Sequence, residues 1–288
     1  MVEPPRITVV IPCYNGGAFL PGALESLCRQ TFRDFEVVVV DDGSDDPATL
    51  AVLATLDEGV RLLRQENRGL AAARNAGIAA AHGAFVLPLD CDDRLEPTFL
   101  ARTLAALEGH PEAAFAFSHL KLEGERTGTL AKDYNTFTQL FLNQLPYALL
   151  MRRGVWQAAG GYDEAMREGY EDWEFNIRLA RKGLAGMVVA EPLFRYHVSN
   201  AGMLKAVANR RHAQLWRRIQ AKHAELYRPR ALVALWWRWR GRPAAYPALL
   251  LAGLLVLHRL LPVEAFNRLF AHLLRLSASA RAGAGEGT

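Results

Sequence analysis

The sequence predicts an α/β fold in which a mostly parallel sheet is flanked by helices. Short, continuous apolar runs such as Ile7–Ile11, Glu36–Val40 and Phe85–Leu89 are typical of strands that are buried on both faces. Segments with helical spacing of apolar residues lie between these runs, and such alternation indicates a parallel sheet. With 288 residues, 51% of them hydrophobic, the chain can form one such domain and an additional segment.

The predicted elements follow one another in a regular order. The first strand, Ile7–Ile11, ends before a loop that contains two glycines. Apolar residues recur at helical spacing over 19–28, and the second strand covers 36–40. The further elements expected are a helix at 49–56, a strand at 60–63, a helix at 70–81 with Asn67 as its N-cap, a strand at 85–89, a helix at 96–108 and strands at 113–118 and 187–190.

Polar side chains follow three of these strands. Tyr14-Asn15 comes after the first strand, Asp41-Asp42 after the second, and Asp90–Asp93 after the strand at 85–89. Because ligands bind beyond the carboxyl ends of parallel strands, we expect the three groups to meet at one crevice. Taken alone, Asp41-Asp42 is more typical of an ordinary turn.

The segment Asp90-Cys91-Asp92-Asp93 places three carboxylates within four residues. Like charges this close raise one another's pKa unless a cation or hydrogen-bond donors neutralise them. Carboxylate oxygens without a neighbouring Cys/His set favour Mg²⁺ or Mn²⁺ over zinc. The alternative is that Asp92 and Asp93 cap the next helix or lie in a solvated turn.

Two common phosphate-binding motifs are absent from the sequence. No Gly-x-Gly-x-x-Gly follows the first strand, and no Gly-x4-Gly-Lys-Ser/Thr occurs. A bound nucleotide would therefore depend on a carboxylate-held metal for contact with its phosphates.

The cysteines and the N-terminus bear on the compartment. Three cysteines that form neither an even set nor a Cys-x-x-Cys pair predict free thiols in a reducing environment. The first residues show no signal-peptide pattern, so we expect this part of the protein to face the cytoplasm.

Six stretches of the chain resemble the family 2 glycosyltransferases, which have the GT-A fold, a Rossmann-like arrangement. These stretches are Val10–Asn15, Gln30–Ser44, Asn67–Gly77, Leu89–Asp93, Gly160–Glu164 and Glu171–Trp173. They occur in the order of the family's motifs between residues 6 and 200, whereas the residues after 205 have no counterpart in this resemblance.

The resemblance implies a donor site at the strand ends. According to the resemblance, the pocket for the nucleotide base and ribose is lined by Pro12, Tyr14, Asp42 and Arg74. Asp42 would accept a hydrogen bond from a uracil-like ring nitrogen. Asp90-Cys91-Asp92 occupies the position of the family's D-x-D motif, which makes Asp92 the metal ligand and gives Asp90 or Asp93 a contact with the ribose or sugar. The alternative for Arg74 is a solvated position on a helix.

The resemblance also places the general base in the pair Glu171-Asp172. We assign that role to Asp172, with Glu171 as a supporting acid; a helix cap is the alternative, because the macrodipole favours an anion there. His197 is expected to contact the metal or the diphosphate, although Arg-Tyr-His differs in spacing from the family's stretch, and a structural hydrogen bond is its alternative. Aromatic residues around Tyr147 suit either the acceptor side of the site or the core.

Residues 205–276 form a basic and apolar extension. The span 205–242 holds eleven Lys and Arg residues against one acid, Glu225, and it is interleaved with tryptophans. This pattern is typical of nucleic-acid binding and of membrane interfaces, and the apolar run at 243–257 favours lipid. Since that run is shorter than the ~20 residues of a spanning helix, we expect helices that lie on an anionic membrane surface. A spanning segment and a homodimerisation arm are the alternatives, and residues 277–288 are expected to be disordered.

The expected protein is thus a GT-A domain at 1–204 with a membrane-associating helical extension. Its expected activity is metal-dependent, inverting transfer of a sugar from a nucleoside diphosphate sugar, with a UDP-sugar favoured, to a hydroxyl of a glycan, glycolipid or other acceptor. We expect it to act in envelope glycan or polysaccharide synthesis at the inner face of the cell membrane, without a nucleic-acid partner. The alternatives are a sugar-nucleotide nucleotidyltransferase, which would need a basic loop that Cys13–Gly17 lacks, and a non-catalytic nucleotide-sugar-binding subunit.

Overall fold

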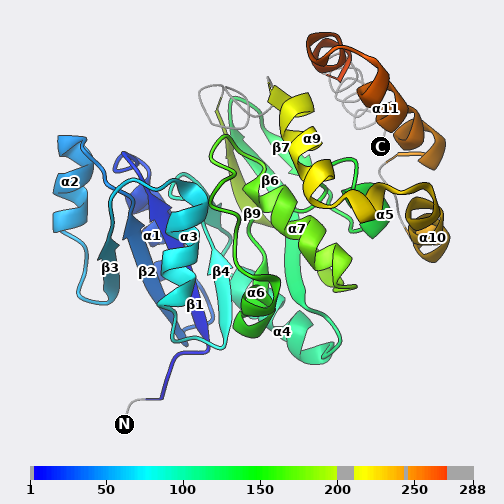
Figure 1. The fold of residues 1–288 in the computed structure, drawn as a ribbon. Helices are drawn as coiled ribbons and strands as arrows, with labels where there is room; N and C mark the ends of the chain where they lie inside the picture. Colours follow the sequence, from blue (N-terminus) through cyan, green and yellow to red (C-terminus); the bar gives the residue numbers. More distant parts are fainter. Residues whose placement is uncertain (1–2, 200–210, 243–245, 271–288) are drawn as a thin grey trace.

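The computed structural model of the protein describes residues 3–199, 211–242 and 246–270. Within these residues, nine strands form one sheet in the order β3-β2-β1-β4-β8-β6-β9-β5, and β7 pairs with β6 (Figure 1). The strands are β1 Ile7–Cys13, β2 Phe35–Asp41, β3 Val60–Arg64, β4 Phe85–Pro88, β5 Arg94–Leu95, β6 Phe115–Gly124, β7 Gly128–Leu130, β8 Leu150–Arg152 and β9 Gly186–Val198. The helices are α1 Leu20–Cys28, α2 Pro47–Ala54, α3 Leu70–Ala79, α4 Phe99–Gly109, α5 Thr136–Gln139, α6 Arg153–Ala159, α7 Glu171–Arg181, α9 His212–Lys222, α10 Pro229–Trp239 and α11 Ala248–Leu260, with a 3₁₀ turn at Ala224–Tyr227.

The N-terminal half of the sheet is parallel and buried on both faces, as the apolar runs predict. β1 pairs in parallel with β2 and β4, and β2 pairs in parallel with β3. Neighbouring residues of β1 point to opposite faces, so that Val9 belongs to one hydrophobic cluster and Val10 to another. Helix α3 lies close to the Val10 face, because a Cβ at Gly77 would be 2.2 Å from Val10 Cγ1.

The second half of the sheet is mixed, and the expectation of a mostly parallel sheet is wrong there. β8 pairs antiparallel with both β4 and β6, and β5 pairs antiparallel with β9. The segment between β7 and β8, residues 131–149, is long enough for a crossover but contains only the four-residue helix α5 and not the longer helix that usually joins parallel neighbours. Parallel neighbours need a crossover of a dozen or more residues, usually a helix, whereas antiparallel neighbours do not.

Two strands are longer than the sequence patterns predict. β6 continues from Phe115 to Gly124, and β9 runs for 13 residues to Val198, so that His197 lies inside a strand and not after one. The two strands pair in parallel along most of their length, with a register shift between Ser118 and Leu120. Long pairing of this kind depends on the partner strand, and therefore local apolar patterns do not mark its end.

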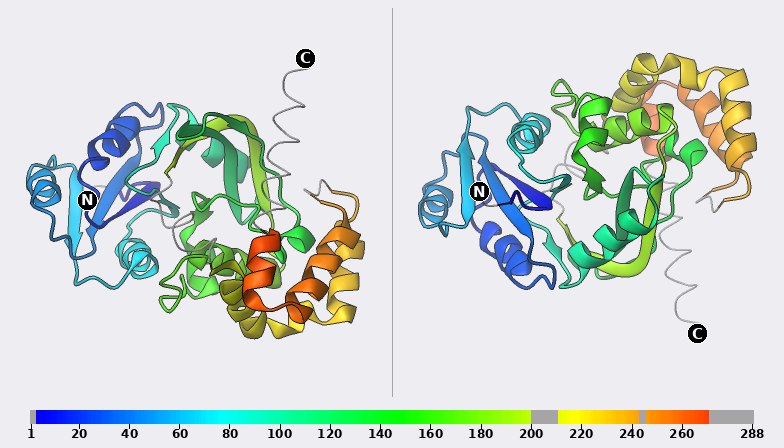
Figure 2. Two further views of the ribbon diagram at one scale, coloured as in Figure 1. Left: turned by 90° about the horizontal axis from the view of Figure 1, so that it is seen from above. Right: turned by 90° about the horizontal axis from the view of Figure 1, so that it is seen from below.

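The described helices after residue 211 pack on the α/β core. Trp216 is 1% exposed, belongs to the same hydrophobic cluster as Phe115, and donates from its indole N–H to the Leu140 carbonyl. Lys222 forms ion pairs with Asp163 and Glu174. Part of the basic extension is therefore folded against the α/β core, and α10 and α11 lie at the opposite end of the molecule from β3 (Figures 1 and 2).

None of the helices in the described ranges combines the length and apolar character that crossing a bilayer requires. The described part of the extension ends at residue 270, so the expected disordered tail at 277–288 and the proposed boundary at 204 lie outside the described residues.

Candidate active site

The ends of β1 and β2 are fixed to one another by their loops. The Asp42 backbone N–H donates to the Cys13 carbonyl at 2.8 Å, and the Asn15 side chain bonds to Asp45 in both directions. This arrangement leaves Tyr14 51% exposed at the edge of the sheet. Pro12, by contrast, is buried within β1 opposite Val40. Of the residues expected to contact the nucleotide base, Tyr14 offers an accessible ring and Pro12 does not.

Asp42 is buried beneath this edge and holds the start of α3. Its carboxylate accepts hydrogen bonds from the Gln65 side chain at 2.6 Å and from the backbone N–H groups of Arg68 and Gly69 at 2.9 and 2.8 Å. Backbone N–H groups at a helix start need such acceptors. The prediction that Asn67 caps this helix is wrong, because Gly69 is the N-cap residue and Asp42 receives the N–H groups instead.

Arg74 joins the two groups of acids that the sequence places far apart. Its guanidinium donates to both oxygens of Asp90 at 2.7 and 2.9 Å and to Glu171 at 2.8 Å, and it lies over the Tyr147 and Tyr162 rings. The side chain is 1% exposed, so the solvated alternative is wrong. Burial alone would lower the pKa of Arg74, but the charges of Asp90 and Glu171 raise it above its usual value.

The Asp93 carboxylate is held in place by hydrogen bonds from other parts of the protein. Tyr147 donates from its hydroxyl to one carboxylate oxygen at 2.5 Å, and the backbone N–H of His197 donates to the other at 2.6 Å. The Tyr147 hydroxyl also accepts from the Asp90 backbone N–H. Burial first, and then the charges of Asp92 and Asp90, raise the pKa of Asp93 well above its usual value. Asp93 thereby ties the acidic loop to β9 and does not face outward, since it is 2% exposed.

Asp92 differs from its neighbours because no other described residue donates a hydrogen bond to its carboxylate. Burial and the charge of Asp90 raise the pKa of Asp92 to about 6, while the charges of His197 and Arg74 oppose that rise. The His197 ring lies beside the Phe19 ring, with 5.5 Å between centroids. A half-buried carboxylate without a donor, whose pKa also responds to the charge of His197, suits a hard divalent cation that keeps other positions for water or phosphate oxygens. Within the described ranges, no group of three or more His, Cys, Asp and Glu residues is placed to hold a metal by itself.

Glu171 and Asp172 begin α7, as the sequence predicts, but in different environments. Glu171 is 5% exposed, and burial raises its pKa to about 7 although Arg74 opposes the shift. Asp172 is half-buried and accepts from Asn143 Nδ2 and from the Trp173 backbone N–H, both at 2.7 Å. Burial also raises the pKa of Asp172, against the charge of Arg74. A partly accessible carboxylate with a raised pKa has the properties of a general base.

Sequence reasoning missed several residues that hold the two groups of acids or lie beside them. Asn143 carries no motif and lies in a segment with weak signals, and Tyr147 is ambiguous between site and core. Tyr170 precedes the pair with φ +63°, a conformation that is uncommon for a residue other than glycine, and its hydroxyl lies 2.9 Å from His212 Nδ1 of α9. Only the three-dimensional contacts reveal these partners, because each contact joins residues that are 29 to 57 positions apart in the sequence.

Comparisons with known proteins agree with the motifs. The sequence profile of glycosyl transferase family 2 matches residues 8–163. The PGL/p-HBAD biosynthesis glycosyltransferase of Mycobacterium bovis (strain BCG / Pasteur 1173P2) is 33% identical over 181 residues, which cover 60% of this chain and 69% of that protein. A putative glycosyltransferase of Bacillus subtilis (strain 168), EpsH, is 37% identical over 105 residues, which cover 36% of this chain and 30% of that protein.

Two solved structures show a similar fold. S. aureus TarS 1-349 in complex with UDP has a TM-score of 0.55 at 24% identity; the match covers 68% of this chain and spans 61% of that one. The mannosyltransferase PcManGT from Pyrobaculum calidifontis, in complex with GDP-Man and Mn²⁺, has a TM-score of 0.60 at 20% identity, with 97% of this chain and 87% of that chain covered. At these identities the likeness concerns the fold alone.

The profile match includes the ends of β1, β2 and β4, and therefore Tyr14, Asp42 and the acids at 90–93. These are the positions from which the resemblance was inferred, and the α/β sheet flanked by helices is consistent with a GT-A fold. The chain belongs to glycosyl transferase family 2.

Proposed function

We propose that this chain is an inverting glycosyltransferase that moves a sugar from a nucleoside diphosphate sugar, with a UDP-sugar favoured, to an acceptor hydroxyl. The observation that carries the proposal is the buried Arg74, which bonds Asp90 on one side and Glu171 on the other. This contact supports a site in which the leaving-group side and the base side of the reaction are neighbours. Neither alternative, a nucleotidyltransferase or a non-catalytic subunit, has a specific observation in its favour.

On the donor side, the exposed Tyr14 and the buried Asp42 beneath it are assigned to the nucleotide base. The exposed Tyr14 ring can stack on the base, and Asp42 has three of its acceptor positions occupied by the protein, which leaves one for a ring N–H. Asp92 and His197 would hold Mn²⁺ or Mg²⁺. When bound, the cation supplies neutralisation of the negative charge on the departing diphosphate. Asp90, Asp93 and Arg74 orient Asp92 by fixing the loop around it.

On the acceptor side, Asp172 takes the proton of the acceptor hydroxyl. The hydroxyl oxygen then forms its bond to the anomeric carbon while the bond to the diphosphate breaks on the opposite face of the sugar, which inverts the configuration. Asn143 fixes the Asp172 carboxylate through a 2.7 Å hydrogen bond. Glu171 is hydrogen-bonded to Arg74 and acts as the buried supporting acid beside Asp172.

We also assign an anionic membrane surface to the C-terminal helices. Large apolar side chains are exposed on α10 and α11, and these are Val233, Trp236, Trp237, Leu249, Leu250, Val256, Leu257 and Leu260. Arg238, Arg240 and Arg259 are exposed on the same helices. Apolar side chains flanked by cations favour the interface of an anionic bilayer. This supports action at the inner face of the cell membrane on an envelope glycan or lipid-linked acceptor.

The proposal is tested by a hydrolysis screen of UDP-, GDP- and dTDP-sugars with Mn²⁺, with Mg²⁺ and with a chelator. We expect release of the diphosphate from one donor class, strongest with UDP-sugars, and loss of that release in the chelator. Activity that persists unchanged with the chelator would overturn the metal assignment, and no release from any donor would overturn the transferase proposal.

A further inference from the structure

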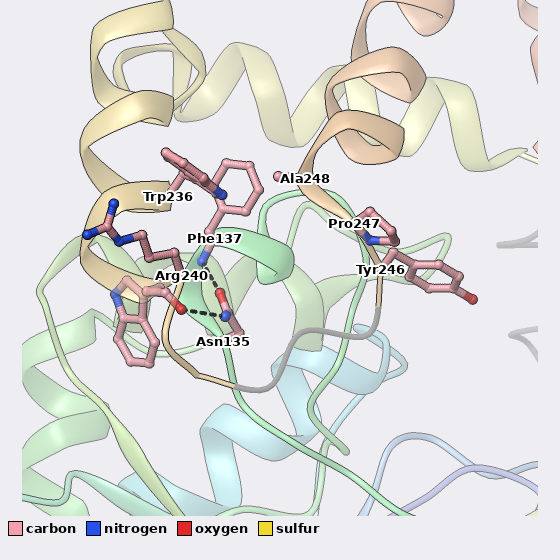
Figure 3. A pocket seen from close by; sticks show the side chains of 8 residues that line it. Asn135, Phe137, Trp236, Arg240, Tyr246, Pro247 and Ala248 are labelled. Atoms are coloured by element: carbon pink, nitrogen blue, oxygen red, sulfur yellow. Dashed lines mark hydrogen bonds between the residues drawn. The ribbon is translucent and has the colours of Figure 1, made fainter.

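A cavity of about 360 Å³ lies between α5, α10 and the start of α11 (Figure 3). Its wall is mainly aromatic and apolar, formed by Phe137, Trp236, Trp239, Pro247 and Ala248 among others. None of the acids of the candidate active site lines it. Its volume is in the range of small-molecule sites, ~300–1,000 Å³.

The polar groups of this cavity wall are few. Asn135 lines the cavity, but its side-chain amide already donates to the Trp239 carbonyl and accepts from the Phe137 backbone N–H (Figure 3). It also donates to the Arg242 carbonyl and accepts from the Thr138 backbone N–H. An Asn side chain has no further strong hydrogen bonds to offer beyond these. A sugar needs several such bonds, whereas a hydrocarbon chain needs none. The wall therefore favours an apolar chain over a glycan.

A cation lies beside the apolar wall. Arg240 lines the cavity, and its guanidinium lies 3.3 Å from the centre of the Trp237 ring, which holds the charge in place. Arg242 follows two residues later and is exposed. An apolar cavity with cations at one side is complementary to a hydrocarbon chain that carries an anionic head group.

The cavity is continuous with the surface assigned above to the membrane. Trp236 lines the cavity and is still 38% exposed, and Leu249, which follows the lining residue Ala248, is 87% exposed. An amphiphile in a bilayer could thus enter the cavity without crossing water.

The cavity is also connected to the acceptor side of the site. Phe137 belongs to α5, and the carbonyl of Gln139 at the end of that helix accepts from the Trp173 indole. The Gln139 side chain bonds Asn143, which in turn holds Asp172. The cavity is therefore lined by the helix whose end, through Gln139 and Asn143, holds the proposed base.

From these contacts we propose that the cavity binds the hydrocarbon chain of the acceptor, and that this acceptor is an anionic amphiphile. The acceptor role in this inference rests on the proposed transferase function, whereas binding of the amphiphile rests on the properties of the cavity alone. It narrows the acceptor from any hydroxyl compound to a lipid with an acidic head group.

The test uses dodecyl phosphate below its micelle concentration, with binding to the full chain measured by calorimetry in the absence of donor. Ala248→Trp adds an indole to the cavity wall, and Ala252→Trp is the matched control, since Ala252 is exposed on the same helix. We expect the wild type and Ala252→Trp to bind, and Ala248→Trp to bind at least tenfold more weakly. Equal binding by the three proteins, with unchanged thermal midpoints, would refute the cavity assignment.

Two further measurements separate the head group and the acceptor role. Dodecyl maltoside, which has a neutral head, should bind more weakly than dodecyl phosphate, and Arg240→Gln should remove that difference. With a membrane-lipid extract as acceptor, Ala248→Trp should lower sugar transfer into the lipid phase at least tenfold relative to Ala252→Trp. If dodecyl phosphate binding is lost in Ala248→Trp but lipid transfer is not, the cavity is not the acceptor site. Failure of the transferase proposal would appear separately, as an absence of donor hydrolysis in the wild type.

Discussion

Replacing Arg74 with methionine tests the buried link between the two groups of acids. The substitution keeps the bulk of the side chain but leaves Glu171, whose side chain is 7% exposed, and Asp90 without their cation. Removing one partner of a buried ion pair costs about 3–5 kcal/mol. At about 2–4 °C per kcal/mol for a domain of 150–250 residues, we expect the thermal midpoint to fall by about 6–20 °C.

The loss should depend on pH in a defined direction. Burial already raises the pKa of Glu171 to about 7 in the presence of Arg74, above the ordinary value of 4.5, so the folded state binds more protons than the unfolded state between these values. Stability therefore rises as the pH falls through the folded-state pKa, because the buried charge is removed. Without Arg74 this pKa should be higher still. The deficit of Arg74→Met should thus be larger at pH 8 than at pH 5.

Arg102→Met is the matched control, because Arg102 forms an exposed ion pair with Glu191. Exposed pairs contribute about 0–1 kcal/mol, so its thermal midpoint should change little. Both variants are compared by calorimetry at pH 5 and pH 8. If Arg74→Met loses no more stability than Arg102→Met, or if its deficit is the same at both pH values, the account of the buried link is wrong.

Three further predictions concern packing, charge and the membrane face. Gly77→Ala should lower the free energy of unfolding by about 1–3 kcal/mol in urea titrations, because the new Cβ would lie 2.2 Å from Val10 Cγ1; an unchanged midpoint would show that α3 can move away from β1. Glu174→Gln should lower the free energy of unfolding by roughly 3 kcal/mol at pH 7, because burial raises the pKa of Glu174 but its bonds to His223 and nearby cations outweigh this and lower it from 4.5 to about 2. The stabilisation by Glu174 is therefore present above pH 4.5 and declines toward pH 2. A loss of stability that persists at pH 2 would contradict this. Leu249→Gln should weaken binding to phosphatidylglycerol vesicles by at least about tenfold in sedimentation assays, since a buried Leu contributes roughly 1.5–3 kcal/mol; equal sedimentation would remove α11 from the membrane face.

The sequence predicts the parallel half of the fold well because its information is local. Strands covered on both faces have continuous apolar runs, and the register of Cys13 with Asp41 then brings the polar strand ends to one edge. The mixed half could not be predicted in the same way. β8 has three residues and β5 has two, and such short strands exist only because neighbouring strands supply their hydrogen bonds.

The same distinction applies to the candidate site. Asp92 stands out because three carboxylates within four residues repel one another, whereas Asp172, at a helix start, is singled out by the family resemblance, since a cap is equally typical there. Arg74 was expected to face the nucleotide, but the structure buries it between two acids, a position that depends on a contact spanning 97 residues. The extension was expected to be membrane-facing as a whole. The side of the extension that carries Trp216 packs on the core. The sequence could not reveal this, because amphipathic spacing does not specify what an apolar face contacts.

The central claim is that the leaving group is held on one side and the proton is taken by Asp172 on the other. Asp172→Asn keeps the shape of the side chain and its hydrogen bond from Asn143 but removes the base. With the donor found in the hydrolysis screen, we expect donor affinity within about threefold of the wild type, and a transfer rate lower by about 10²–10⁴-fold. Full transfer activity in Asp172→Asn, at an unchanged thermal midpoint, would contradict the account.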